Sequence, residues 1–216
     1  MTGADASPSQ PAAPGRSVEI ELKFDVDDAH DVPDWSAVPG VASVTAGEHR
    51  ELDALYLDDE STSLARAGYA VRRRTGGPDE GWHIKGPRGA DGGRVELHWP
   101  LGTDDVVPEA VRTEVESVTT AQLNALARIR NSRTVYFLLD PDGAVVAEFA
   151  DDHVRTRDER SGTEREWHEW EIELGPAAPA DSAGRTAFFA AIERAALAAG
   201  ARAASSDSKL ARALGH

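Results

Sequence analysis

Hydrophobic and charged residues alternate in several short segments, and this alternation is the main structural signal in the sequence. In residues 18–26, apolar side chains occupy every second position, beginning with Val18, Ile20 and Leu22, and charged side chains lie between them. A period of two is typical of a β-strand with one apolar and one polar face. The same kind of pattern predicts further strands at residues 53–57, 68–75, 81–85, 94–99, 133–139, 144–154 and 166–174.

Helical spacing is confined to a few segments. It predicts helices at residues 108–118 and 119–129, a longer Ala-rich helix at 181–199 and a short helix around 208–214. About eight strands in hairpin order, with few and mostly late helices, predict a predominantly β (α+β) fold with an antiparallel sheet. About eight strands are enough to close a barrel, but periodicity alone supports a barrel and a sandwich equally.

Length and composition indicate one globular domain. The chain has 216 residues, 40% hydrophobic and 28% charged. Residues 1–16 are rich in Ala, Pro, Ser and Gly and predict a disordered leader, which leaves residues 17–212 as the domain. The chain has no cysteine, no secretory signal and no apolar run near the ~18 residues of a membrane span, so we expect a cytoplasmic protein without membrane contact.

The charge balance narrows the classes of ligand. A net charge of −15 argues against nucleic-acid binding, which usually needs a basic face. It leaves open an anionic ligand held by basic groups inside a cavity. The sequence does not indicate the oligomeric state, and the seven histidines show no metal-binding spacing.

Charged side chains gather on single faces of several predicted strands. A solvent-facing polar side is the ordinary explanation for each strand alone. Three glutamates on one strand face repel each other unless cations lie nearby, however, and the apolar faces already provide a core. If the sheet closes around the charged faces, carboxylates suited to Mg²⁺ or Mn²⁺ and cations suited to phosphate line one lumen. The three groups are Glu19, Glu21 and Lys23; Arg72 and Arg74; and Glu169, Glu171 and Glu173.

The ordered series of motifs resembles the CYTH domain family, the triphosphate tunnel metalloenzymes related to class IV adenylate cyclase and thiamine triphosphatase. The segment EIELKF at residues 19–24 is similar to the E-x-E-x-K signature of the family, and the resemblance covers residues 17–212. One departure is Asn131, where the family often has a basic residue; Arg130 is the neighbour that could supply the charge. The motifs that follow in family order are DALYLDD, GYAVRRR, WHIKGP, RVELHW, NSR, AEFADDHV, WEIEL and SSDSKL.

The resemblance implies an eight-stranded antiparallel β-barrel, a triphosphate tunnel with acidic and basic walls and flanking helices. It implies metal-dependent hydrolysis of a triphosphate compound, with inorganic triphosphate as the leading substrate and Mg²⁺ or Mn²⁺ as the cofactor. The alternatives are an adenylate cyclase that forms cyclic AMP from ATP, for which no adenine-reading motif is visible, and a non-catalytic polyphosphate-binding module. Some family members also carry a helical CHAD domain linked to polyphosphate, and none is expected within these 216 residues.

The resemblance also implies a role for individual residues. The implied metal ligands are Glu19, Glu21, Asp152, Glu171 and Glu173; the triphosphate-binding residues are Lys23, Arg72, Arg74, Lys85, Arg133 and Lys209; and the catalytic residues are Glu21, Lys23, Lys85 and Glu173. The motifs place three further charged residues at family positions, Arg94, Glu96 and Glu148, and Ser208 beside Lys209.

Overall fold

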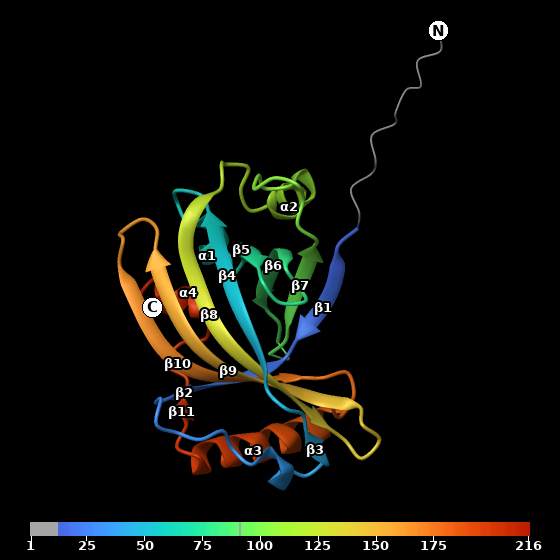
Figure 1. The fold of residues 1–216 in the computed structure, drawn as a ribbon. Helices are drawn as coiled ribbons and strands as arrows, with labels where there is room; N and C mark the ends of the chain where they lie inside the picture. The colour runs from blue at the N-terminus through green and yellow to red at the C-terminus, as the bar shows by residue number, and fades with distance from the viewer. Residues whose placement is uncertain (1–12, 91) are drawn as a thin grey trace.

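The computed structural model describes residues 13–90 and 92–216, and a large antiparallel sheet dominates it (Figure 1). The strands are β1 (Gly15–Glu19), β2 (Glu21–Val26), β3 (Ser43–Val44), β4 (Glu48–Asp58), β5 (Ala70–Thr75), β6 (Gly81–Arg88), β7 (Arg94–Trp99), β8 (Asn124–Leu139), β9 (Val145–Asp158), β10 (Glu164–Leu174) and β11 (Arg202–Ala203). The helices are α1 (Ser63–Arg66), α2 (Glu109–Val115), α3 (Ser182–Ala198) and α4 (Lys209–Ala213), with a short 3₁₀ turn, η1 (Trp35–Ala37).

The strand order explains how the sheet encloses a lumen. It runs β1-β7-β6-β5-β4-β8-β9-β10-β2-β11, with β3 beside β8, and every pair is antiparallel. The hydrogen-bonded path is therefore open, although β1 at one end and β2 near the other are separated only by Ile20. The continuous backbone joins the two ends, and the Ile20 carbonyl accepts a hydrogen bond from the Leu174 N–H at 3.0 Å.

The predicted β-dominated, antiparallel class is confirmed, and the closure differs from the expected one. The chain forms more strands than the eight predicted, and its sheet is not a complete ring of hydrogen bonds. The single strand predicted at residues 18–26 is two strands with different partners, because β1 pairs with β7 and β2 pairs with β10. One run of alternating residues thus supplies a strand at one end of the sheet and a strand near the other end, and joins them.

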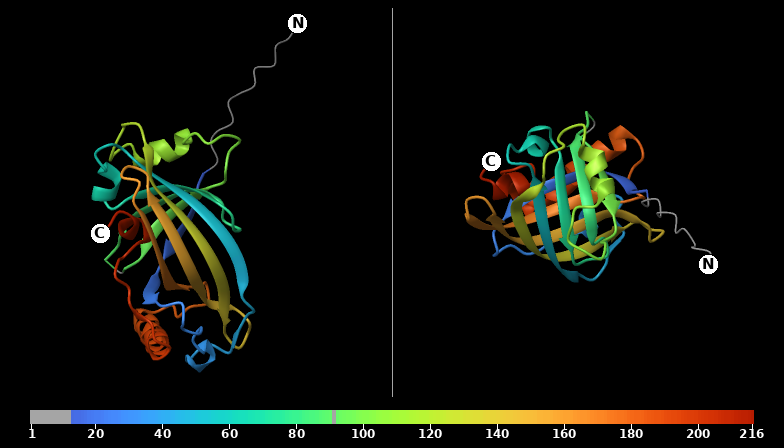
Figure 2. Two further views of the ribbon diagram at one scale, coloured as in Figure 1. Left: turned by 60° about the vertical axis from the view of Figure 1, so that its left-hand side comes forward. Right: turned by 90° about the horizontal axis from the view of Figure 1, so that it is seen from above.

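Helices α2 and α3 cover apolar faces of the strands on the outside of the tunnel (Figures 1 and 2). Trp170 and Ile172 of β10 pack in a core with Ile192 of α3. Val71 of β5 packs in a second core with Val111 of α2. Since neighbouring side chains on a strand point to opposite faces, this packing turns the charged positions between them towards the lumen.

The helix predicted at residues 119–129 is wrong, because residues 124–139 form the long strand β8. The segment is rich in Ala, Leu and Arg, which favour helices in isolation. In the folded chain, β8 pairs with β4 on one side and β9 on the other and buries Ala127 and Ile129. Hydrogen bonding on both edges and this burial outweigh the local preference.

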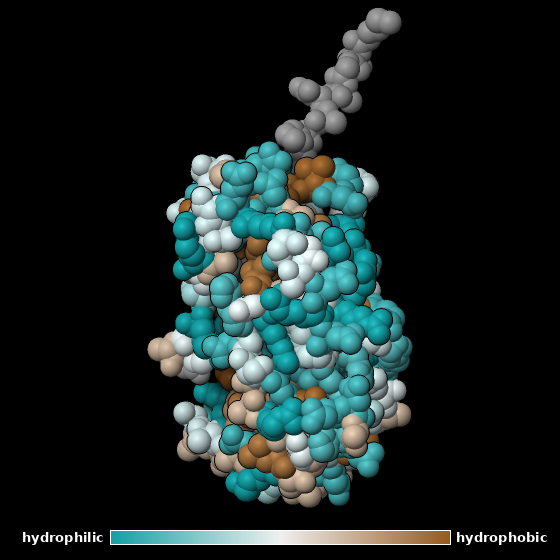
Figure 3. Space-filling view, turned by 90° about the vertical axis from the view of Figure 1, so that its left-hand side faces the viewer, coloured by the Kyte–Doolittle hydropathy of each residue, from teal (hydrophilic) through white to brown (hydrophobic). Residues whose placement is uncertain are grey.

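The remaining predicted elements agree with the structure to within a few residues at most boundaries. Most of the predicted leader, residues 1–12, lies outside the described residues, but Gly15 and Arg16 already belong to β1. No helix in the described part of the chain has the length and hydropathy of a membrane span. The surface seen in Figure 3 is largely hydrophilic, with hydrophobic residues in small separate patches.

Candidate functional site

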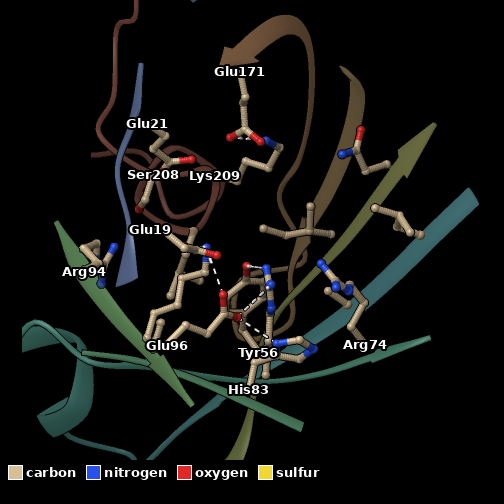
Figure 4. A pocket seen from close by; sticks show the side chains of 18 of the residues that line it. Glu19, Glu21, Tyr56, Arg74, His83, Arg94, Glu96, Glu171, Ser208 and Lys209 are labelled. Atoms are coloured by element: carbon tan, nitrogen blue, oxygen red, sulfur yellow. Dashed lines mark hydrogen bonds and ion pairs between the residues drawn. The ribbon is translucent and has the colours of Figure 1, made fainter. Parts of the chain in front are cut away.

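The sheet encloses a cavity of about 940 Å³ that collects almost every sequence-predicted site residue (Figure 4). These residues come from β1, β2, β5, β6, β8, β10 and α4, segments far apart in the sequence. Asp152 is the predicted residue that does not line the cavity. Those that do are Glu19, Glu21, Lys23, Arg72, Arg74, Lys85, Arg133, Glu171, Glu173 and Lys209.

Three glutamates on adjacent strands form an acidic cluster on one side of the lumen. Glu173 of β10 is the direct cross-strand partner of Glu21 on β2 and of Glu148 on β9. Burial raises the pKa of Glu173 to about 7; Lys85 opposes the rise, and the charges of Glu21 and Glu148 add to it. Neighbouring carboxylates of this kind suit a hard divalent ion such as Mg²⁺ or Mn²⁺. The donor set therefore fits the predicted metal, with Glu148 as an additional ligand candidate.

Glu19 of β1 and Glu96 of β7 form a second pair of neighbouring carboxyl groups. Burial raises the pKa of Glu19 to about 8, with a further contribution from its hydrogen bond to Glu96, whereas Lys85 opposes the rise. Burial also favours protonation of Glu96, but the hydrogen bond with His83 and the charges of Lys85 and Arg72 outweigh it and hold the pKa well below its ordinary value. Within this pair, protonation is therefore favoured on Glu19 and ionisation on Glu96.

Lys209 occupies the centre of another carboxylate group. Its Nζ atom lies 2.9 Å from Asp152, 2.5 Å from Glu169 and 2.7 Å from Glu171. These three carboxylates are close enough to ligate one metal ion, but the ammonium group lies among them. Ser208 positions the lysine, because its hydroxyl oxygen caps α4 by accepting a hydrogen bond from the Ala211 N–H at 3.1 Å.

Asp152 is fully buried behind the lumen surface. Arg133 donates to both of its carboxylate oxygens, from Nε at 2.7 Å and from Nη2 at 2.6 Å. The same Nη2 atom lies 2.5 Å from Glu171, which also pairs with Lys23 and Lys209. The contacts favour a positioning role for Asp152, and its predicted role as a metal ligand remains a prediction.

The remaining lumen cations lie mainly on β5 and β6. Arg72 contacts the Tyr56 hydroxyl at 3.2 Å and Glu96 at 3.2 Å. Arg74 pairs with Asp79, and Lys85 lies 2.5 Å from Glu19. The cations are therefore held in place by partners within the cavity, which limits the loss of side-chain entropy when an anion binds.

At the position where this chain departs from the family pattern, Asn131 faces the lumen and its neighbour Arg130 faces the outside. Asn131 is buried and lines the cavity. Arg130 points the other way, because its side chain is 65% exposed and lies 3.3 Å from Asp53. Neighbouring residues on one strand cannot share a face, so Arg130 does not replace the missing lumen charge.

His83 is a lumen residue to which the sequence pattern assigned no role. It is buried and lines the cavity, with Nδ1 2.7 Å from Glu96 and Nε2 3.0 Å from the Asp79 carbonyl. Its position two residues before Lys85 places both on the same face of β6. This spacing of two residues could have identified His83 as a lumen residue. The same spacing places Glu96 and Arg94 on one face of β7.

The raised pKa values predict that metal binding strengthens with pH. Glu173, with a pKa of about 7, and Glu19, with a pKa of about 8, must each lose a proton before they can bind a cation as carboxylates. Glu173 alone would be about one-tenth ionised at about pH 6 and almost fully ionised at about pH 9. We therefore expect Mg²⁺ affinity to rise at least about tenfold over that range, as measured by calorimetric titration.

The metal-free protein should show the opposite trend in stability. A carboxyl group whose pKa rises on folding from 4.5 to about 7 stabilises the fold fully below 4.5, and the contribution is lost as pH rises through 7. The thermal midpoint in chelator should fall as pH rises from about 4.5 to about 7 and then level off, and added Mg²⁺ should restore it. Glu173→Gln, which cannot ionise, should flatten this dependence; an Mg²⁺ affinity independent of pH would contradict the prediction.

A family comparison and a sequence comparison both find relatives of this chain. The family model described as the CYTH domain matches residues 17–196. The uncharacterized Mycobacterium tuberculosis protein Rv2226 is 34% identical over 220 residues, which cover 96% of this chain and 42% of that protein. The chain thus spans less than half the length of this curated relative.

Solved structures with the same fold include two proteins linked to nucleotide chemistry by their descriptions. A candidate adenylate cyclase from Bacillus halodurans aligns with a TM-score of 0.61 and 16% identity, covering 92% of this chain and 98% of that one. A candidate adenylyl cyclase from Hippeastrum, described as having a dominant triphosphatase activity, aligns with a TM-score of 0.52 and 16% identity, covering 91% and 95%. At this identity the likeness shows the fold alone.

Proposed function

Because this chain belongs to the CYTH domain family, we propose that it is a divalent-metal-dependent triphosphatase whose substrate is inorganic triphosphate. The observation that carries the proposal is the enclosure of an acidic cluster and a set of cations in one cavity. The described activity of the Hippeastrum protein, which shares the fold, agrees with it. The relative Rv2226 is longer than this chain, so the proposed activity is that of the domain and not of a whole protein.

Substrate binding would rest on the cationic side chains of the lumen. A chain of linked phosphates carries several negative charges, and Arg and Lys neutralise phosphate oxygens, Arg often through two parallel hydrogen bonds. Arg72, Arg74 and Arg133 come from β5 and β8, and Lys209 enters from α4. Phosphate oxygens would replace carboxylates such as Glu171 as the partners of these cations.

Catalysis would rest on the acidic cluster of the lumen. Glu21, Glu148 and Glu173 would hold the metal, with Glu19 close by. A bound Mg²⁺ or Mn²⁺ ion supplies charge withdrawal from phosphate oxygens and a lowered pKa of coordinated water. Water adds to the terminal phosphorus, the phosphoanhydride bond breaks, and the products are phosphate and diphosphate, so no protein nucleophile is needed.

Lys23 and Lys85 lie beside glutamates of the lumen. Lys23 Nζ is 3.0 Å from Glu21, and Lys85 Nζ is 2.5 Å from Glu19. A fixed positive charge beside the ligands of the metal is well placed to stabilise the charge that develops on the leaving diphosphate. We therefore assign both lysines to catalysis as well as to substrate binding.

The lining of the lumen favours inorganic triphosphate over a nucleotide. Among the described residues that line the cavity, there is no tryptophan and no phenylalanine on which a base could stack. Tyr56 and Tyr69 are aromatic residues of the lining, but Tyr56 is buried with its hydroxyl bound to Arg72. Tyr69 packs against the core that contains Val71 and Val111. A phosphate chain needs the charges that are present and no aromatic platform.

The direct test measures product formation from inorganic triphosphate, ATP and thiamine triphosphate with Mg²⁺ or Mn²⁺. We expect phosphate release, fastest from inorganic triphosphate, and none in excess chelator. Cyclic AMP formation from ATP would instead identify a cyclase. Triphosphate binding without turnover of any substrate would identify a polyphosphate-binding module, and full activity in chelator would refute the metal dependence.

Replacement of Arg72 or Arg74 by alanine should chiefly weaken triphosphate binding. A hydrogen bond to a charged group contributes about 1.5–3 kcal/mol, so we expect a loss of roughly tenfold or more in affinity. The measurement is triphosphate titration with Mg²⁺ fixed, and KM should rise more than kcat falls. Arg155→Ala is the matched control, since its side chain is 82% exposed on the outer face. Equal effects of Arg72→Ala and Arg155→Ala would contradict the assignment.

A further inference from the structure

Two histidines and an aspartate meet on the outer face of the sheet, away from the lumen. His153 of β9 and His168 of β10 are direct cross-strand partners, and their rings stack with centroids 4.1 Å apart and an interplanar angle of 17°. Asp28, just after β2, points its Oδ1 atom at both rings, 3.2 Å from Nδ1 of His168 and 3.6 Å from Nδ1 of His153. All three ligand atoms lie within 4.8 Å of one another.

This cluster faces away from the triphosphate site. Trp170 and Ile172 share the face of β10 that carries His168, and both belong to the outer core under α3. Asp152 and Glu169 form the next cross-strand pair after the two histidines. They lie on the other face of the sheet, with Lys209. The backbone of the sheet thus separates the cluster from the lumen.

The buried histidine is oriented as metal-ligating histidines are. His168 is 9% exposed, and its Nε2 atom lies 2.5 Å from Asp151 Oδ1, which also accepts a hydrogen bond from Trp170 Nε1 at 2.9 Å. A carboxylate that accepts the hydrogen bond from Nε2–H leaves the lone pair on Nδ1. That Nδ1 atom makes no hydrogen bond of acceptable geometry and faces the carboxylate oxygen of Asp28. Burial lowers the pKa of His168, but Asp151 and Asp28 outweigh it and raise the pKa, so this position favours a positive charge, either a proton on Nδ1 or a metal ion in its place.

We propose that Asp28, His153 and His168 form a site for a divalent transition metal ion, with Zn²⁺ as the reference ion. Two imidazole nitrogens and one carboxylate oxygen suit Zn²⁺, Co²⁺ or Ni²⁺, whereas Mg²⁺ prefers oxygen ligands alone. Side chains of Asp28 and His153 are 81% and 55% exposed, so both can rotate to complete the coordination, and water can fill the open positions. Bound metal would tie the turn after β2 to strands β9 and β10.

The test is a calorimetric Zn²⁺ titration of the untagged chain, with excess Mg²⁺ present to occupy the oxygen ligands of the lumen. We expect one Zn²⁺ site that His153→Ala or Asp28→Ala weakens by at least about tenfold, with folding checked by circular dichroism. Asp151→Asn, which removes the charge that orients His168, should weaken it about 10–100-fold. Zn²⁺ should also broaden or shift the imidazole resonances of His153 and His168 in a nitrogen-detected NMR spectrum.

His49→Ala is the matched control. His49 is an exposed histidine whose Nε2 atom lies 2.8 Å from Glu51, so it has a carboxylate neighbour but is not part of the three-residue cluster. This variant should keep the full Zn²⁺ affinity. Wild-type Zn²⁺ affinity in His153→Ala, or an equal loss in His49→Ala, would overturn the proposal and leave the cluster as a network of ion pairs.

Discussion

Replacing Glu173 by glutamine is expected to reduce metal-dependent triphosphate hydrolysis by about 100-fold or more. Glu173 lies between Glu21 and Glu148 on adjacent strands, at the centre of the acidic cluster. An amide oxygen is a poor replacement for an anionic ligand of Mg²⁺. A metal ion contributes several kcal/mol to charge stabilisation in such reactions, and a loss of about 3 kcal/mol corresponds to roughly 100-fold in rate.

The measurement distinguishes a loss of metal binding from a loss of substrate binding. Titrating Mg²⁺ at fixed triphosphate should show weakened metal binding in Glu173→Gln, while triphosphate affinity is kept because the cationic residues are unchanged. Glu166→Gln is the matched control, since Glu166 lies on the opposite, exposed face of the same strand. If Glu173→Gln remained folded with wild-type turnover and Mg²⁺ dependence, the acidic cluster would not be the metal site.

Replacing Asp152 by asparagine is expected to destabilise the fold by about 3–5 kcal/mol, the usual result of removing one partner from a buried ion pair. Asp152 is fully buried and pairs with both Arg133 and Lys209. The asparagine keeps the shape but leaves both cations short of a negative charge. For a domain of this size the change lowers the thermal midpoint by about 6–20 °C.

A matched surface pair provides the control for Asp152. Asp53 is also bound by both arms of an arginine, Arg128, at 2.8 Å and 2.7 Å, but the arginine side chain is 44% exposed. Exposed ion pairs contribute about 0–1 kcal/mol, so Asp53→Asn should shift the thermal midpoint much less. The rise of the thermal midpoint on addition of Mg²⁺ distinguishes a metal-ligand role of Asp152 from a positioning role. If Asp152→Asn abolished it, Asp152 would be a metal ligand, as the sequence predicts; if the stabilisation persists, Asp152 positions Arg133 and Lys209.

Which residues form strands could be predicted because the information is local. The alternation of Val71 with Arg72, or of Ile172 with Glu173, appears in the sequence and fixes which side chains share a face. The strand β8 could not be predicted in full, because its first half favours a helix locally. Only its pairing with β4 and β9 makes the extended form more stable.

The candidate site followed from the motifs, but the partners of each residue did not. Strand spacing placed Glu21 and Glu173 on charged faces, and the resemblance to the family implied a role for Lys209. Register between strands decides that Glu173 meets Glu148, and the packing of α4 decides that Lys209 lies beside Asp152. Register depends on interactions between segments up to the length of the chain apart, so sequence spacing cannot reveal it.

The histidine cluster shows the same limit most clearly. His153 and His168 are 15 positions apart, a spacing typical of no metal motif, and only the antiparallel register of β9 and β10 stacks their rings. The alternating faces, the β-dominated class and the set of charged residues follow from the order of the amino acids alone. The enclosure of the charged faces depends on packing between distant segments, because α2 and α3 bury apolar faces on the outside and the chain between β1 and β2 joins the ends of the sheet.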